Sequence, residues 1–376
     1  MNLTVKKGNT LLLDGPASVA LTAGKAEVFG VQIRTAQRLI IREGKRLPLN
    51  VQETASFDVS LGAEAKAQEA EGNTIPPSWE DAYQTLRQLQ KKPAVTMVMG
   101  RADSGKSSFC TYLINRLLTK KCTVALLDED LGQSDVGPPC TIAYTKITQP
   151  VTDHFELEAE KVFFVGTNSP RFEAEKTLRG VTVLMEEMLA DQNIDFVIVN
   201  TDGWATGEDA VQFKTRLADA VKPDIVFCLQ SEEEIPSFCA SVGDALAKYR
   251  QERAQSPAVV RERSREKRRS LRELGYAKYL ENGKVKVYPL NHITVSREEN
   301  ALIWEHRAEK LLLALYDAHG QFRGIGVLRN VDYVRKALKI FTAIAEKPAS
   351  LGFGRIRLDE NLHEIPENTL SNWVSG

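Results

Sequence analysis

One stretch of the sequence strongly limits what the chain can fold into. An apolar run at residues 95–99 leads into Gly-Arg-Ala-Asp-Ser-Gly-Lys-Ser at residues 100–107. Apolar residues then recur at helical spacing from Phe109 to Leu118. Strand, Gly-x-x-x-x-Gly-Lys-Ser and helix is the order of a phosphate-binding P-loop. The stretch therefore predicts a domain that binds a nucleoside triphosphate.

Each position of this loop has a physical task. Gly100 and Gly105 permit backbone angles and a close approach that a side chain would block. The N–H groups at the start of the next helix attract phosphate, helped by the positive end of the helix dipole. We expect Lys106 to reach the β- and γ-phosphates and Ser107 to bind Mg²⁺. The predicted nucleotide-binding residues are Gly100, Asp103, Ser104, Gly105, Lys106, Ser107 and Ser108.

Length and composition restrict the class of protein. The 376 residues are 43% hydrophobic and 26% charged, so a globular chain with two or three domains is expected. The net charge of -1 means that a nucleic-acid site has to be a local basic patch. The five cysteines form no Cys-x-x-Cys pair and predict reduced thiols. No leader and no apolar run of about 18 residues is seen, so we expect a cytoplasmic protein, or a nuclear one in a eukaryote.

The strand and helix patterns predict three domains: 1–75, 76–280 and 281–376. The first shows short β-type runs, and its polar stretch at 62–73 is expected to be a linker or loop. A capping-box-like start at Ser78 predicts a lead-in helix over 78–90. Strand-like apolar runs then follow at 95–99, 123–127, 162–165, 196–200 and 225–229. They alternate with amphipathic helices expected at 107–119, 173–190 and 209–220, which is typical of a parallel sheet.

The fold class that follows is α/β. A central P-loop NTPase-type parallel sheet carries helices on both faces, between a small N-terminal all-β domain and a small C-terminal α+β domain. In the last domain we expect strand, turn and strand over 301–315 and a helix over 331–345, with Val334, Leu338 and Phe341 on its apolar side. Ligands of such parallel sheets bind beyond the carboxyl ends of the strands.

Two carboxylates at alternate positions, Asp128 and Asp130, follow the second strand of the nucleotide domain, in Asp128-Glu129-Asp130-Leu131-Gly132-Gln133. Acidic residues at this place in P-loop enzymes hold Mg²⁺ or activate a nucleophile. Phosphoryl transfer needs alignment, charge neutralisation and a proton acceptor. We expect Asp130 to act as the base and Asp128 to belong to the metal shell. Solvated surface carboxylates are the alternative.

A tryptophan follows the fourth strand, in Asn200-Thr201-Asp202-Gly203-Trp204. It belongs to the loops that meet at the ligand-binding edge of the sheet. The indole either packs into the protein or forms a stacking platform for a nucleic-acid base.

The most charged part of the chain, residues 250–272, carries a cluster of arginines. Arg268 and Arg272 share one side of a helix because they are four residues apart. They can form a lid that neutralises transition-state charge, grip a nucleic-acid backbone, or lie on a solvated helix face.

Together these motifs resemble one family, the polynucleotide 5′-hydroxyl kinases related to the RNA kinase of mRNA cleavage and tRNA splicing complexes. The resemblance is carried by the P-loop at 100–107, Asp128-x-Asp130-x-Gly132-Gln133, a clasp at Thr201-x-Gly203-Trp204 and a lid within 261–272. Ala26-Glu27-Val28-Phe29-Gly30 also resembles the N-terminal segment of that family. The similarity is weak after residue 281.

The resemblance implies a kinase that transfers the γ-phosphate of ATP or GTP, with Mg²⁺, to the 5′-hydroxyl of single-stranded RNA, with DNA left open as a substrate. It also implies a set of site residues. The catalytic residues would be Lys106, Asp130, Arg268 and Arg272, the metal ligands Ser107, Asp128 and Asp130, and the nucleic-acid-binding residues Gln133, Thr201, Trp204 and Arg263.

Asp202 departs from the family pattern and places a negative charge where a polyanion would bind. The alternative function is a catalytically silent ATP-binding scaffold of an RNA-processing complex. A nucleotide switch of the same P-loop branch is a third interpretation, although a switch has no need of a tryptophan clasp. Protein partners and oligomeric state are not predicted.

Overall fold

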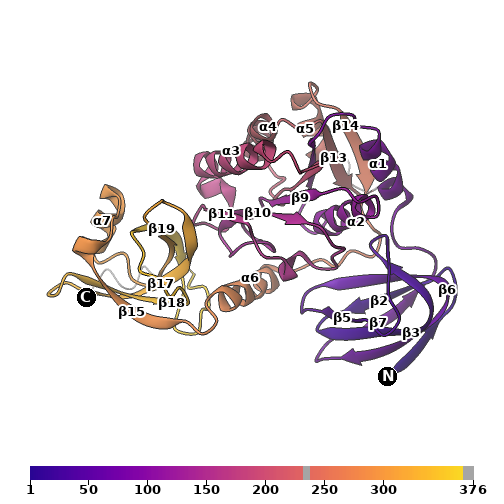
Figure 1. Ribbon diagram of the computed structural model, residues 1–376, viewed down its shortest axis with the longest axis horizontal. Coiled ribbons are helices and arrows are strands. Elements are labelled where there is room, and N and C mark those ends of the chain that lie inside the picture. The colour runs from indigo at the N-terminus through magenta and orange to yellow at the C-terminus, as the bar shows by residue number, and fades with distance from the viewer. Residues whose placement is uncertain (232–237, 367–376) are drawn as a thin grey trace. The chain divides into compact units, whose positions relative to one another are not determined.

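The computed structural model describes residues 1–231 and 238–366 (Figure 1). The chain divides into two compact units, each assembled from several segments. The first unit contains residues 1–127, 145–157 and 185–267, and the second contains 128–144, 158–184 and 268–376. The division into three domains stays a prediction, and residues 367–376 of the predicted third domain lie outside the described ones.

The N-terminal segment of the first unit is an antiparallel sheet, and buried apolar residues alternate along much of its longest strand. In β6 (Arg46–Leu61), for example, Leu47, Leu49, Phe57 and Val59 are buried. The main strand order is β4-β3-β6-β2-β7, with β1 on β6 and β5 on β3. The other bounds are β1 (Asn2–Val5), β2 (Thr10–Asp14), β3 (Ala17–Val28), β4 (Val31–Gln32), β5 (Arg38–Ile41) and β7 (Ala67–Ala70).

The expectation of a linker or loop over 62–73 is wrong for part of that stretch. Strand β7 lies within it and pairs antiparallel with β2, from Ala67 opposite Leu13 to Ala70 opposite Thr10. Its side chains are half-buried or exposed, so the strand has no apolar alternation to reveal it. Backbone pairing to the buried strand β2 fixes it instead.

The central sheet follows the order β11-β10-β9-β12-β8-β13-β14. Strands β12, β8 and β13 run parallel, as predicted, and β14 pairs in parallel with β13. All seven residues of β8 are buried, which explains its continuous apolar sequence. The bounds are β8 (Ala94–Gly100), β9 (Val124–Asp128), β10 (Thr141–Ile147), β11 (Lys161–Phe164), β12 (Phe196–Asn200), β13 (Ile225–Gln230) and β14 (Gln251–Gln255).

Two features of this sheet differ from the prediction. The strand expected at 162–165 is β11, but it runs antiparallel to β10 and is not a parallel core strand. Strands β10 and β14 were not expected. The latter lies in the arginine-rich part of the chain, where only Ala254 of its five residues is buried. The α/β class is nevertheless confirmed, with strand-rich N-terminal and C-terminal parts.

The helices predicted over 78–90, 107–119, 173–190 and 209–220 lie close to those of the structure, whereas the helix over 238–245 was not predicted. Their bounds are α1 (Pro77–Arg87), α2 (Lys106–Leu118), α3 (Ala174–Ala190), α4 (Glu208–Val221), α5 (Phe238–Ala245) and α6 (Arg265–Tyr279), and the 3₁₀ turns are η1 (His154–Glu156), η2 (Pro170–Phe172) and η3 (Leu290–His292). The capping box expected at Ser78 is wrong, since α1 begins after Pro76 without a side-chain cap. The Ser78 hydroxyl instead accepts a hydrogen bond from the Gln255 N–H, which ties α1 to β14.

The C-terminal sheet of the second unit is antiparallel, with the order β15-β18-β17-β16-β19. The helix expected over 331–345 is wrong: Val331 of β17 pairs with Leu338 of β18. Val334, expected on the apolar helix face, is 94% exposed between these strands. The bounds are β15 (Lys284–Pro289), α7 (Arg297–Trp304), β16 (Leu311–Tyr316), β17 (Phe322–Asp332), β18 (Ala337–Thr342) and β19 (Ser350–Arg357).

The first strand expected within 301–315 is also wrong, because α7 extends through Trp304 before β16 begins. A true capping box starts this helix: the Ser296 side chain accepts from the Glu299 N–H, and the Glu299 side chain accepts from the Ser296 N–H. The local chemistry at 296–299 therefore outweighs the β-type residues that follow.

Two further expectations concern the chain as a whole. Cys228 of β13 is disulfide-bonded, so the prediction of reduced thiols is wrong for this residue, whereas Cys110, Cys122 and Cys140 are free. Within residues 1–231 and 238–366, no helix is both long enough and apolar enough to cross a membrane.

Candidate functional site

The P-loop lies between the end of β8 and the start of α2, as the sequence predicts. Gly105, just before the helix, has a left-handed φ of 94°, and Asp103 has a φ of 60°. The first intrahelical hydrogen bond is donated by the Phe109 N–H to the Gly105 carbonyl. The N–H groups of residues 106–108 thus have no acceptor within the helix. Such a helix start is suited to bind the oxygens of a phosphate.

Lys106 is 6% exposed and is held by the P-loop itself. Its Nζ donates to the carbonyl oxygens of Gly100 at 2.9 Å and Arg101 at 2.7 Å. The buried Ser104 hydroxyl has no hydrogen-bond partner within the described part of the chain. This loop therefore offers both a positive charge and an unsatisfied hydroxyl, which a phosphate oxygen can satisfy.

The predicted metal and base residues lie at the end of β9 and just beyond it. Asp128 is fully buried, and its Oδ2 accepts hydrogen bonds from the N–H groups of Asp135 at 2.8 Å and Val136 at 3.3 Å. Asp130 Oδ1 accepts from the N–H groups of Gly132 and Gln133. Backbone donors thus fix the orientation of both carboxylates. Carboxylate oxygens are ligands that Mg²⁺ prefers, as is the Ser107 hydroxyl.

The structure places two of the predicted lid residues, Arg268 and Arg272, on α6, in the same unit as Asp128 and Asp130. Arg263 precedes this helix. The Gln133 side chain donates to the Arg268 carbonyl at 3.0 Å, which joins the acidic loop to this helix. Arg272 donates to both carboxylate oxygens of Glu364, at 2.7 and 2.6 Å. Burial lowers the pKa of Arg272, but the Glu364 hydrogen bonds and charge outweigh burial and raise it. Glu364 was not singled out in the sequence.

The clasp loop packs on the P-loop, and both belong to the first unit. The Thr201 hydroxyl donates to the Val98 carbonyl at 2.9 Å. A Cβ on Gly203 would lie 2.7 Å from Ala102 Cα, so a glycine is required there. The half-buried Trp204 indole lies beside the Phe213 ring, with 5.7 Å between ring centroids. The contact with Phe213 supports packing, and the position of the loop beside the P-loop supports stacking.

Asp202 does not present an exposed negative charge. Its side chain is buried and forms an ion pair with the buried Lys214 of α4. Its Oδ1 accepts from the Trp204 N–H at 2.6 Å. The expected repulsion of a polyanion is therefore neutralised inside the protein. Lys214 was missed from the sequence, where it is one lysine among the apolar residues of an amphipathic helix.

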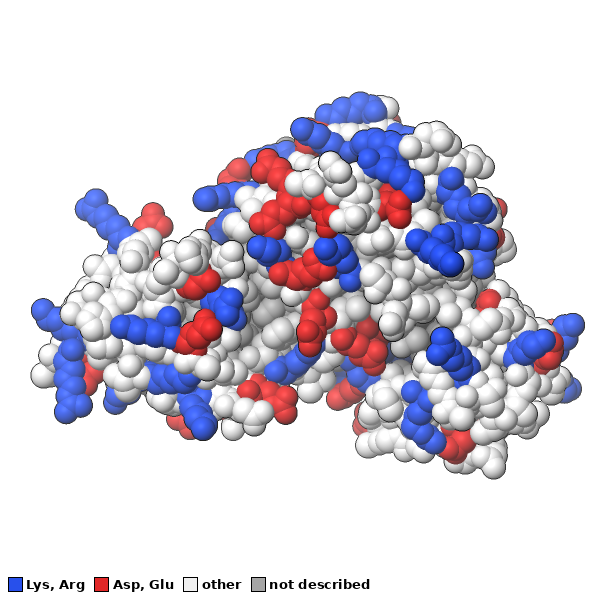
Figure 2. Space-filling model, viewed as in Figure 1, with Lys and Arg blue, Asp and Glu red and all other residues white. Residues whose placement is uncertain are grey.

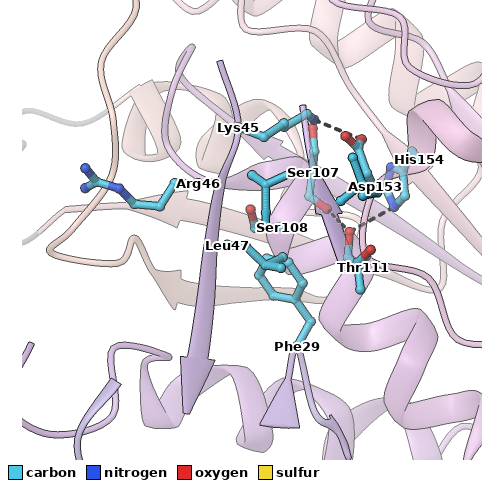
Figure 3. Close-up of a pocket in the computed structure, with 12 residues that line it drawn as sticks. Phe29, Lys45, Arg46, Leu47, Ser107, Ser108, Thr111, Asp153 and His154 are labelled. Atoms are coloured by element: carbon cyan, nitrogen blue, oxygen red, sulfur yellow. Dashed lines mark hydrogen bonds and ion pairs between the residues drawn. The ribbon is translucent and has the colours of Figure 1, made fainter. Parts of the chain in front are cut away.

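A pocket lies where the N-terminal sheet meets α2 (Figure 3). Its walls include Phe29 and Leu47 on one side and Ser107, Ser108 and Thr111 on the other. Further lining residues are Ile40, Ile41, Lys45, Arg46, Thr152, Asp153 and His154. The sequence predicted only the two serines of this set, although Phe29 lies in the segment 26–30 that resembles the family's N-terminal pattern.

Hydrogen bonds and ion pairs fix the polar wall of the pocket. The nitrogen Nε2 of the buried His154 lies 3.0 Å from Thr111 Oγ1. Asp153 pairs with Lys45 at 3.5 Å (Figure 3). It also pairs with Arg42 at 2.5 Å. The N-terminal sheet and the segment around η1 thus form a fixed wall beside the helix start.

The predicted site residues fall into two groups. The P-loop, Thr201, Trp204 and Arg263 lie in the first unit, whereas Asp128, Asp130, Gln133, Arg268 and Arg272 lie in the second. The groups adjoin along the chain at Leu127–Asp128 and Lys267–Arg268. Arg263 contacts Asp103 of the P-loop. Among the described residues, no group of three or more His, Cys, Asp or Glu side chains forms a metal site on its own.

On the face shown in Figure 2, basic and acidic side chains are interspersed. This distribution agrees with the net charge of -1. Nucleic-acid binding on this face would therefore depend on individual basic residues and on stacking.

Comparisons with known proteins agree with these motifs. Residues 100–282 match the family model of the mRNA cleavage and polyadenylation factor CLP1 P-loop. A protein of Pyrococcus abyssi named polyribonucleotide 5′-hydroxyl-kinase is 25% identical over 346 residues, covering 78% of this chain and 95% of the relative. The kinase of the same name from Thermococcus kodakarensis is 28% identical, covering 76% and 95%.

A solved structure shares the fold. The Clp1p chain of a Clp1p–Pcf11p complex has a TM-score of 0.73 at 14% identity, covering 95% of this chain and 97% of that one. The shared fold, the family-model match at residues 100–282 and the similarity to the named kinases agree with the family that the motifs indicated. The resemblance of this chain to the polynucleotide 5′-hydroxyl kinases of the CLP1 type is confirmed.

Proposed function

We propose that this protein transfers the γ-phosphate of ATP to the 5′-hydroxyl of RNA. The observation that carries the proposal is the close packing of Gly203 on Ala102 of the P-loop. The Thr201 hydrogen bond to Val98 of β8 fixes the same loop just before the P-loop begins. This packing brings a tryptophan to the phosphate-binding loop. A kinase that acts on a polynucleotide end can use such a ring for stacking, whereas a nucleotide switch has no need of it.

The names of the similar proteins support the same substrate. The archaeal relatives are named polyribonucleotide 5′-hydroxyl-kinases, and this chain spans 95% of two of them. RNA is therefore the substrate that we favour, with DNA as a second polymer to be tested. The cytoplasmic location and the protein partners are not needed for the proposal, and the former stays a prediction.

The P-loop would bind the phosphates of the donor. The N–H groups at the start of α2 would donate to the phosphate oxygens, and Lys106 would exchange its two carbonyl partners for the β- and γ-phosphates. Ser107, Asp128 and Asp130 would hold Mg²⁺. When bound, the ion neutralises charge that develops on the transferring phosphoryl group.

The pocket of Figure 3 adjoins the helix start and would hold the nucleoside of the donor. Its apolar wall, with Phe29 and Leu47, suits the face of a base. Its polar wall, with Thr111 and Asp153, can position hydrogen-bonding groups. A pocket of this kind selects a donor by shape and hydrogen bonding, so it would decide between ATP and GTP.

The acceptor side would depend on Asp130, Trp204 and the α6 arginines. Asp130 would accept the proton of the attacking 5′-hydroxyl, and Trp204 would stack on the terminal base. Arg272 already has two hydrogen bonds to Glu364, so it would contact a phosphoryl group only by exchanging them. Arg268 is the lid arginine that we favour for charge neutralisation.

The direct test is transfer of labelled γ-phosphate from ATP or GTP to 5′-hydroxyl RNA and DNA oligonucleotides of one sequence. We expect labelled RNA with the wild-type protein and none with Lys106→Ala, because that variant lacks the charge that bridges the phosphates. If wild type and Lys106→Ala label RNA equally, the proposed site is wrong.

The scaffold interpretation gives a different result in the same experiment. An ATP-binding scaffold would bind ATP but label neither polymer with either donor. Measuring ATP binding alongside transfer therefore separates the two functions.

A further inference from the structure

Arg263 is bound to the P-loop and to the N-terminal sheet at once. Its Nη1 donates to Asp103 Oδ1 at 3.1 Å, and its backbone N–H donates to Asp103 Oδ2 at 3.0 Å. Its Nε and Nη2 both donate to the Gly44 carbonyl, at 3.1 and 3.0 Å. One arginine thus makes four hydrogen bonds to two segments that lie far from it in the sequence.

The neighbouring residues hold the same segment against the N-terminal sheet. Arg46 donates to the Val259 carbonyl at 2.9 Å, and Lys267 forms an ion pair with Glu43. Arg263 lies between these two contacts along the chain, and its side chain is 22% exposed. Residues 259–267 therefore run as a strap between the N-terminal sheet and the P-loop, within the first unit.

Asp103, the partner of Arg263, carries its negative charge within the phosphate-binding loop. Asp103 lies in the P-loop with a left-handed φ of 60°, a conformation that costs energy for a residue other than glycine. Its side chain is only 7% exposed. A carboxylate in this loop repels a triphosphate unless its charge is compensated. Two hydrogen bonds from Arg263 both orient the carboxylate and compensate its charge.

We propose that Arg263 is a positioning residue for the nucleotide: it holds Asp103, and through it the P-loop, in the shape that binds the triphosphate. This role differs from the nucleic-acid contact that the sequence predicted for Arg263. Its Nε, Nη1 and Nη2 all donate within the protein, to Asp103 and Gly44. The inference rests on the proposed function, which supplies ATP as the ligand. ATP binding can be measured without turnover, so the inference and the proposed function are tested separately.

The geometry makes the guanidinium group essential. The Gly44 carbonyl is bound by Nε and Nη2 on one edge of the fork, while Nη1 reaches Asp103. A lysine carries one ammonium group and cannot reproduce this planar arrangement. A contact to a nucleic-acid backbone, by contrast, depends mainly on charge, so lysine would largely preserve it.

The test measures the Kd for ATP and for a 5′-hydroxyl RNA oligonucleotide by calorimetric titration of the full chain. We expect Arg263→Ala to raise the ATP Kd about ten- to a hundredfold, the range for residues that orient a ligand-binding group. Arg263→Lys should show a similar loss, and the oligonucleotide Kd should change less than about twofold in both. Arg34→Ala, which removes one exposed positive charge of the same unit, is the matched control and should leave both constants unchanged.

Substitution of Asp103, which accepts the hydrogen bonds of Arg263, tests the same contact a second time. In an Asp103→Asn background, Arg263→Ala should raise the ATP Kd by no more than about threefold, because the two residues act through one interaction. The proposal would be overturned if each substitution alone weakened ATP binding and the two losses multiplied in the double variant. So would an Arg263→Lys protein that binds ATP like the wild type, or a loss confined to the oligonucleotide. A wild-type protein that binds no ATP would instead overturn the proposed function.

Discussion

The loop that contains Asp130 fixes the orientation of the Asp130 carboxylate. Two N–H groups, of Gly132 and Gln133, donate to Oδ1 and fix the orientation of the side chain. A proton acceptor in phosphoryl transfer needs orientation more than an extreme pKa, because the bond to the leaving group weakens early. The proposed assignment of Asp130 as the base is consistent with this local geometry.

Asp130→Asn should keep the loop hydrogen bonds and remove the proton acceptor. We expect kcat for RNA phosphorylation to fall about 10²- to 10⁴-fold, the range for loss of a general base, with ATP binding largely kept. A titration of Mg²⁺ is the control, since recovery of the rate at high Mg²⁺ would assign Asp130 to the metal instead. If the rate does not fall at all, Asp128 becomes the candidate.

Trp204 tests the alternative that sequence reasoning left open. Trp204→Ala should weaken oligonucleotide binding by about 1–3 kcal/mol, the energy of stacking one base, and leave the ATP Kd unchanged. Trp204→Phe should recover part of the loss because it restores an aromatic face. Equal losses for both ligands, or a melting temperature that falls far enough to explain them, would mean that the indole only packs against Phe213.

At the scale of elements, two polar clusters tie strands and helices together. In the N-terminal sheet, Arg46 of β6 donates to both carboxylate oxygens of Asp14 on β2, at 2.7 and 2.9 Å. In the second unit, Arg269, Arg272 and Tyr276 of α6 all donate to Glu364. The first cluster joins β2 to β6, and Arg46 and Leu47 of β6 line the pocket. The second cluster joins Glu364 to α6, the helix that carries Arg268 and Arg272.

The Asp14 pair predicts a pH dependence of stability. Burial raises the pKa of Asp14, but the hydrogen bonds and charge of Arg46 outweigh burial and lower it. The ionised carboxylate therefore stabilises the fold above its unfolded pKa of about 3.9, and this contribution disappears as pH falls through the lower folded pKa. Asp14→Asn should lose stability at pH 7, and the gap to wild type should close toward pH 2.

Urea unfolding between pH 7 and pH 2 measures this gap. Asp58→Asn is the control, because Asp58 forms an exposed ion pair with Arg38 and should change stability little at any pH. A gap for Asp14→Asn that stays constant down to pH 2 would contradict the account.

Glu364 anchors α6 through its carboxylate. Glu364→Gln leaves the mostly buried Arg272 guanidinium without its counter-charge, so we expect a loss of about 1–3 kcal/mol in the free energy of unfolding. Glu360→Gln, at an exposed position four residues earlier, should have no measurable effect. Equal stability of the two variants in urea would show that the cluster does not hold the helix.

Sequence analysis located the features that a single short segment of the chain determines. The spacing of Gly100, Gly105 and Lys106 located the P-loop and the helix that follows it, because one short segment supplies both the backbone and the charge. The continuous apolar run of β8 located a buried strand for the same reason.

Sequence reasoning failed where distant segments decide the structure. Val334, Leu338 and Phe341 fit a helical period, but pairing between β17 and β18 determines the conformation of Leu338 and Phe341. Neither Lys214 beside Asp202 nor Gly44 beside Arg263 could be found from spacing, since each pair is made by the fold. The wall of the pocket around His154 has the same origin.

For the whole molecule, the central claim is that the P-loop and the clasp loop serve one reaction at an RNA 5′ end. The packing of Gly203 on Ala102 makes the two loops a single structural element. If that element binds a 5′ end beside the donor phosphates, ATP turnover must be linked to the chemical nature of that end.

The most direct measurement is the intact mass of three RNA oligonucleotides of identical sequence after incubation with ATP and Mg²⁺. One ends in a 5′-hydroxyl, one in a 5′-phosphate and one in a 5′-deoxy carbon. The account predicts the gain of one phosphate on the first and no gain on the other two, with ADP formed in proportion. ADP formed equally with all three oligonucleotides, and no phosphate gained by any, would contradict it.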